Sequence, residues 1–94
     1  MNTLTEERLE REFKVTEKAL KELKIIVGKN DKNYEKALHF IDTARRYYED
    51  AKFFRDKGDK ASAFGALNYA FGWLDVGKSI GLFEETDYVK EKKK

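Results

Sequence analysis

The 94-residue chain contains no cysteine and no proline, and it has a single histidine, His39. Without cysteine there are no disulfides, no thiolate chemistry and no cysteine-ligated zinc or iron–sulfur sites. A lone histidine also excludes paired-histidine metal sites and most acid–base relays, so His39 is predicted to be a polar surface residue. These absences predict a protein that uses no cofactor.

Long hydrophobic stretches are missing as well. The longest run without a charged residue covers residues 61–74, which is 14 residues, whereas a transmembrane helix needs roughly 20. The first residues are polar and acidic, unlike a secretory leader. We therefore expect a soluble, cytoplasmic protein with no membrane partner. The many Lys and Glu residues, with no Cys or Gln, also favour a thermostable protein.

Charge is nearly balanced, with 20 Lys and Arg against 18 Asp and Glu, a formal net charge of +2. Residues 90–94 carry four Lys and one Glu, or +3, so residues 1–89 hold 16 basic and 17 acidic side chains, or −1. Hydrophobic residues make up 40% of the chain, which is enough for a core. The sequence thus predicts one neutral domain at 1–89 and a flexible Lys-rich tail at 90–94.

Three segments show the apolar spacing that is typical of helices. In the first, Thr3 and Glu6 match a capping box. Mostly apolar residues then follow at spacings of 4-3-4-3-4 from Leu9 to Val27, and Gly28 stands where a left-handed C-terminal cap belongs. Because this stripe is narrow, the helix is predicted to lie on the outside of a bundle.

Asn30 or Asp31 is predicted to cap the second helix, which runs to about Lys57 with Gly58 as its terminator. Its apolar face covers roughly half of the circumference, so it must contact more than one neighbour. An aromatic flank with a seven-residue spacing lies beside this face: Phe40, Tyr47 and Phe54.

The third helix is predicted over residues 60–79, between an N-cap at Asp59 and a stop at Gly81. Because residues 61–74 carry no charge, this helix should be buried. Its apolar surface continues on both sides of the inner stripe: Ala66, Tyr69, Trp73 and Val76 on one, Phe64 and Phe71 on the other. Residues 82–89 supply further hydrophobic anchors. The predicted fold is all-α: an antiparallel bundle of three long helices with a short C-terminal fourth segment.

Residues 72–79, Gly-Trp-Leu-Asp-Val-Gly-Lys-Ser, match the G-x-x-x-x-G-K-S string of a phosphate-binding P-loop. That chemistry needs a preceding strand and a small, flexible loop whose backbone N–H groups wrap the phosphates. Here the preceding residues are helical in pattern, and Trp73, Leu74 and Val76 are bulky. The match is therefore interpreted as a coincidence, and no enzymatic activity is predicted.

Five residues on the third helix form a candidate interaction surface: Phe64, Gly65, Asn68, Gly72 and Asp75. Glycine inside a helix is about 1 kcal/mol less favourable than alanine, and close approach of another helix would explain both glycines. Coverage of this helix by the C-terminal segment, and a structural hydrogen bond of Asn68, are the competing interpretations. The first hypothesis is a non-catalytic module that self-associates, or binds another helical protein, through the third helix.

Four basic residues of the second helix support an alternative hypothesis: Arg45, Arg46, Lys52 and Arg55. Together with the Lys tail they would serve an accessory domain associated with RNA or a nucleotide. Neighbouring Asp and Glu residues balance these charges, which favours a solvated mixed-charge face. A third hypothesis, an enzyme that uses Asn68, Asp75 and a Tyr, has no nucleophile–base pair to support it.

One pattern extends over about residues 44–82. It comprises Tyr48-x-Asp50-Ala51, then Gly58-Asp59, then residues 68–75, Asn-Tyr-Ala-x-Gly-Trp-Leu-Asp. It resembles a family of short archaeal proteins of unknown function, in which a His often precedes the Gly-Trp pair where this chain has Phe71. The resemblance implies an archaeal, cytoplasmic helical bundle, and it implies no activity.

Overall fold

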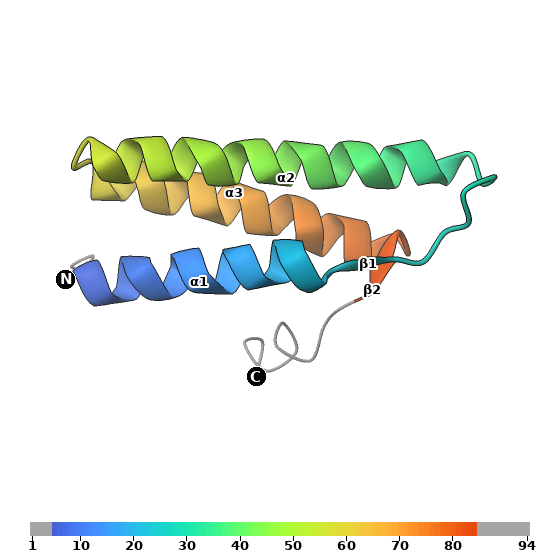
Figure 1. The fold of residues 1–94 in the computed structure, drawn as a ribbon, viewed down its shortest axis with the longest axis horizontal. Coiled ribbons are helices and arrows are strands. Elements are labelled where there is room, and N and C mark those ends of the chain that lie inside the picture. The colour runs from blue at the N-terminus through green and yellow to red at the C-terminus, as the bar shows by residue number, and fades with distance from the viewer. Residues whose placement is uncertain (1–4, 85–94) are drawn as a thin grey trace.

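The computed structural model describes residues 5–84. Three helices account for most of them: α1 (Glu6–Glu22), α2 (Asn33–Asp56) and α3 (Lys60–Ser79). Two short strands, β1 (Lys24–Ile25) and β2 (Phe83–Glu84), form a two-stranded antiparallel sheet. Each helix runs antiparallel to the one before it, so that α3 lies along α2 and α1 lies beside this hairpin (Figure 1). The predicted all-α antiparallel bundle is confirmed.

The C-terminal end of α2 and both ends of α3 follow the capping chemistry that the sequence predicts. Gly58 and Gly81 adopt positive φ angles of 83° and 82°, which glycine tolerates without steric penalty. Asp59 caps α3, since its carboxylate accepts a hydrogen bond of 3.0 Å from the Ser62 N–H. The predicted cap of α2 at Asn30 or Asp31 is wrong, because the N-cap is Lys32 and its side chain makes no capping bond. Asp31 lies one residue before it, and its carboxylate accepts a hydrogen bond from the Asn33 N–H at 2.8 Å.

The predicted ends of the first helix are wrong. The N-cap is Thr5, whose hydroxyl accepts from the Arg8 N–H at 3.1 Å, while Thr3 lies outside the described residues. The helix stops at Glu22 instead of continuing to Val27, because Lys24 and Ile25 pair with Glu84 and Phe83 in the sheet. Accordingly, Gly28 has no positive φ angle and caps no helix.

The start of the predicted fourth segment is a strand and not a helix. Leu82 and Phe83 are each only 2% exposed and fill the end of the core between α1, α2 and α3. The Leu82 N–H donates to the Gly77 carbonyl at 2.8 Å, and the Ile26 N–H donates to the Leu82 carbonyl at 3.0 Å. Residues 85–89 and the Lys-rich tail at 90–94 lie outside the described residues.

Small residues line the contact between α2 and α3. Alanines recur every seven residues on α2, at Ala37, Ala44 and Ala51, and all three are fully buried. They face buried alanines of α3 in the same core clusters: Ala63, Ala66 and Ala70. Small facing residues allow two helix axes to approach closely, so α2 and α3 form the tightest contact of the bundle.

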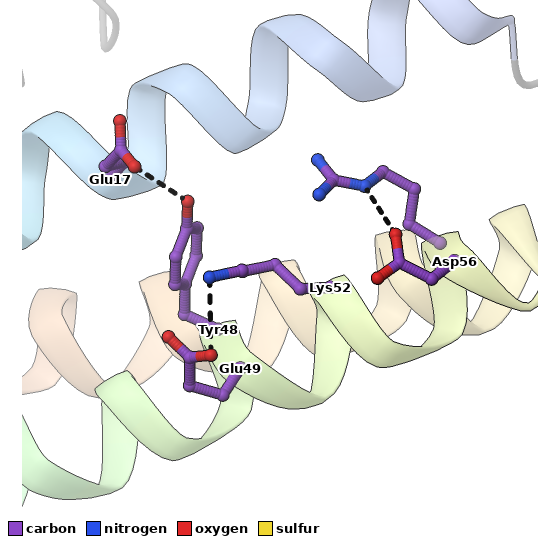
Figure 2. Close-up of polar contacts among 6 residues, drawn as sticks. Glu17, Tyr48, Glu49, Lys52 and Asp56 are labelled. Atoms are coloured by element: carbon purple, nitrogen blue, oxygen red, sulfur yellow. Dashed lines mark hydrogen bonds and ion pairs between the residues drawn. The ribbon is translucent and has the colours of Figure 1, made fainter.

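Polar contacts attach α1 to α2. The Tyr48 hydroxyl donates a hydrogen bond of 3.1 Å to Glu17, which lies across the gap between the two helices (Figure 2). Burial of Tyr48, together with this bond to a carboxylate, raises the pKa of its hydroxyl to about 12. Arg55 stacks 4.3 Å above the centre of the Phe13 ring and pairs with Glu10 at 3.7 Å.

Candidate interaction surface on helix α3

The P-loop-like string at residues 72–79 lies entirely inside α3. Helical hydrogen bonds occupy its backbone, and the residues directly before it, 60–71, belong to the same helix and not to a strand. Its second glycine, Gly77, is buried against the Phe83 ring, which fills the space where a Cβ would be. Glycine at position 77 therefore makes room for the Phe83 ring, and the segment lacks the loop geometry that binds phosphates.

A shallow depression lies on the exposed side of α3. It has a volume of about 340 Å³ and is lined by Asn68, Tyr69, Gly72, Trp73 and Val76. Two residues of this lining, Tyr69 and Val76, are 65% and 51% exposed. Tyr69, Gly72, Trp73 and Val76 have the i, i+3, i+4, i+7 spacing of the hole that receives a side chain in a helical coiled coil.

Aromatic rings join this side of α3 to α2. Tyr69 stacks on Tyr47 with the ring centres 5.3 Å apart, and Trp73 meets Phe40 edge-on at 5.0 Å. The exposed His39 lies edge-on to Trp73 at 6.2 Å. Two residues of the aromatic flank predicted on α2, Phe40 and Tyr47, thus contact residues that line the depression, and these contacts were not predicted. The third, Phe54, packs in the core cluster at the other end of the bundle.

Four exposed or half-exposed positions of α3 follow one another with 4-3-4 spacing: Gly65, Tyr69, Gly72 and Val76. We call them the outer seam. A Cβ built on either glycine of the seam has no heavy atom of residues 5–84 within 4 Å. In the interior of a helix, the helix propensity of glycine is about 1 kcal/mol less favourable than that of alanine. In contrast to Gly77, packing within residues 5–84 gives these two glycines no role.

The structure divides the predicted surface residues between two sides of α3. Asn68 and Gly72 line the depression, and Gly65 lies on the same outer seam. Phe64 instead lies toward α1, where the Arg8 guanidinium stacks 5.0 Å from its ring centre. Asp75 pairs with Lys78 at 3.7 Å and does not line the depression.

The predicted phosphate contacts do not form one basic patch. Three of the four cations are in ion pairs: Arg46 with Asp42 at 3.1 Å, Lys52 with Glu49 at 3.4 Å, and Arg55 with Glu10 at 3.7 Å. The Lys52–Glu49 pair lies beside Tyr48 in Figure 2. Arg55 stacks on α1, whereas Arg45 and Arg46 are exposed on α2. Electrostatic support for a nucleic-acid interface is therefore weak.

Two further features of the described chain concern metals and membranes. Within residues 5–84, no group of three or more His, Asp or Glu side chains is placed to hold a metal ion. None of the helices in this range combines the length and the apolar character that a membrane crossing requires.

Comparison with known proteins identifies a family. A family model described as "Protein of unknown function (DUF357)" matches residues 11–83. This range holds all three helices except the first turns of α1, as well as the whole outer seam. No curated protein and no solved structure matches the chain.

Proposed function

The chain belongs to the DUF357 family of proteins of unknown function, and we propose that it is a non-catalytic interaction module that self-associates through the outer seam of α3. The observation that carries this proposal is the pair of seam glycines, Gly65 and Gly72, with open space beside them. They lower the helix propensity of α3, and no packing contact within residues 5–84 requires a glycine at either position. A second helix that approaches closely would use both of them.

The exposed apolar side chains beside the glycines support the same proposal. Tyr69 and Val76 leave more than half of their surface in water, and Ile80, just after α3, is 54% exposed. Burial of apolar surface contributes about 25 cal/mol per Å², so covering this row with a second helix would contribute favourably to the free energy of association. The aromatic contacts of Tyr69 and Trp73 with α2 fix the shape of the surface before association.

The test replaces Gly72 by arginine. A Cβ at this position meets no atom of the described residues, 5–84, so the Gly72→Arg variant should fold with unchanged helical content by circular dichroism. Its charged side chain projects into the proposed contact and should convert the assembly to single chains. Molar mass by light scattering after size exclusion measures this, with a mass near 11.0 kDa expected for the variant.

The matched control is Leu38→Arg. Leu38 is 45% exposed, and at 100° per residue it lies on roughly the opposite side of α2 from Phe40, which contacts Trp73. This variant should keep the mass of the unmodified chain. The proposal fails if Gly72→Arg associates as the unmodified chain does, or if the unmodified chain itself has the mass of a monomer.

A further inference from the structure

The outer seam is complementary to itself about its midpoint, because each of its glycines mirrors a large residue: Gly65 mirrors Val76, and Gly72 mirrors Tyr69. From one end it reads Gly65, Tyr69, Gly72, Val76, so a glycine and a large residue alternate. On the basis of the proposed self-association, we infer that α3 packs against α3 of a second copy in antiparallel orientation. The two-fold axis then lies at the level of residues 70–71.

This register pairs every large residue of the seam with a glycine. Tyr69 lies opposite Gly72 of the second copy, and Val76 lies opposite its Gly65; the two-fold axis repeats both contacts. The depression above Gly72 then receives the exposed Tyr69 side chain of the other copy. A knob entering a hole of four residues is the packing unit of paired helices. All four seam residues are used, and none faces a residue of its own size.

A parallel arrangement of the same two helices fits less well. In register, it places Tyr69 against Tyr69, where two large side chains compete for the same space. It also places Gly72 against Gly72, where a gap between the helices remains unfilled. The parallel arrangement also places Asp75 of one copy at the same height as Asp75 of the other, and likewise Lys78, so that like charges lie side by side. The antiparallel arrangement separates these charges along the helix axis and opposes the two helix dipoles.

Charge favours a second copy as the occupant. Residues 61–74 of α3 carry no charged side chain, so two copies of the seam meet without repulsion. Asp75 and Lys78, the charged residues of α3 at the C-terminal end of the seam, already form an ion pair at 3.7 Å. A seam that complements itself about its own midpoint needs no other partner to fill its holes.

The test uses the absence of native cysteine. Two single variants are made, Gly65→Cys and Val76→Cys; the first has open space for its side chain and the second replaces an exposed residue. In the antiparallel register, position 65 of one copy faces position 76 of the other. The same position in the two copies, 65 and 65 or 76 and 76, is separated by 11 residues along the helix axis, or about 16 Å. This exceeds the Cα separation of about 4.4–6.8 Å that a disulfide spans.

Each variant is oxidised alone, and the two are also mixed under reducing conditions, left to exchange and then oxidised. The masses of the cross-linked products identify the pairs. We expect the mixed 65–76 product alone. Self-linked products of each variant, or no product from variants that have the mass of a dimer, overturn the antiparallel pairing and leave self-association intact. If the variants and the unmodified chain are all monomers, the proposed function itself fails.

Discussion

The contact between Gly77 and Phe83 gives the sharpest prediction about the fold. A Cβ on Gly77 would lie 2.6 Å from Cδ2 and 2.8 Å from Cζ of the Phe83 ring, and closer still to Cε2. Phe83 is 2% exposed, so its ring has no free space into which to withdraw. Gly77→Ala therefore forces the ring out of its place beside the end of α3.

The size of the effect follows from two opposing contributions. Alanine in place of glycine stabilises a helix by up to about 1 kcal/mol, and overpacking of a core destabilises it by about 1–3 kcal/mol. Gly77→Ala should thus lower the free energy of unfolding by up to about 2 kcal/mol. Phe83→Ala alone should lower it by about 3–5 kcal/mol. With the ring removed, Gly77→Ala should become stabilising by up to about 1 kcal/mol.

Urea unfolding followed by circular dichroism measures all four chains of this double-mutant cycle. One chain concentration is used throughout, because association would shift the apparent stability. Phe83→Leu, which shortens the side chain, serves as the background if Phe83→Ala does not fold. An equal effect of Gly77→Ala with and without the Phe83 ring would show that the ring is not why glycine occupies this position.

Two predictions concern pH. The pKa of Tyr48 is raised from 10.0 to about 12 by burial and by its bond to Glu17, so its stabilising contribution is complete below pH 10 and lost as pH rises toward 12. Tyr48→Phe should flatten this alkaline decline in urea unfolding, and an unchanged decline would contradict it. Hydrogen bonds from Ser62 lower the pKa of Asp59 below 3.8, so its contribution is present above that value and lost as pH falls through the lowered pKa. The destabilisation by Asp59→Ala in thermal unfolding should shrink in acid; a pH-independent effect would refute the cap.

Local chemistry allowed the hairpin of α2 and α3 to be predicted from sequence. Gly58, Asp59 and Gly81 each act through their own backbone or their near neighbours, which a sequence displays directly. The end of α1 depends instead on a distant contact. Residues 24 and 25 continue a helical pattern, yet they pair with β2, about 60 residues later in the chain. A two-residue strand has no periodicity by which to recognise it.

The candidate surface was predictable only in part for a similar reason. Helical spacing of 100° per residue fixes which residues share a side of α3, and it grouped Gly65, Asn68 and Gly72 correctly. It does not fix the side on which α1 packs. Phe64 therefore appeared to be a surface candidate, although α1 brings Arg8 onto its ring. The role of Gly77 was equally hidden, because its neighbour Phe83 approaches from beyond the turn at Gly81.

Self-association of the unmodified chain is the central claim, and equilibrium sedimentation over a range of chain concentrations and salt tests it most directly. The seam is apolar, so the association should persist in high salt, where contacts between exposed charges are screened. The expected result is a mass of twice 11.0 kDa at the higher chain concentrations, in low and high salt alike. A mass of 11.0 kDa under every condition would contradict the claim.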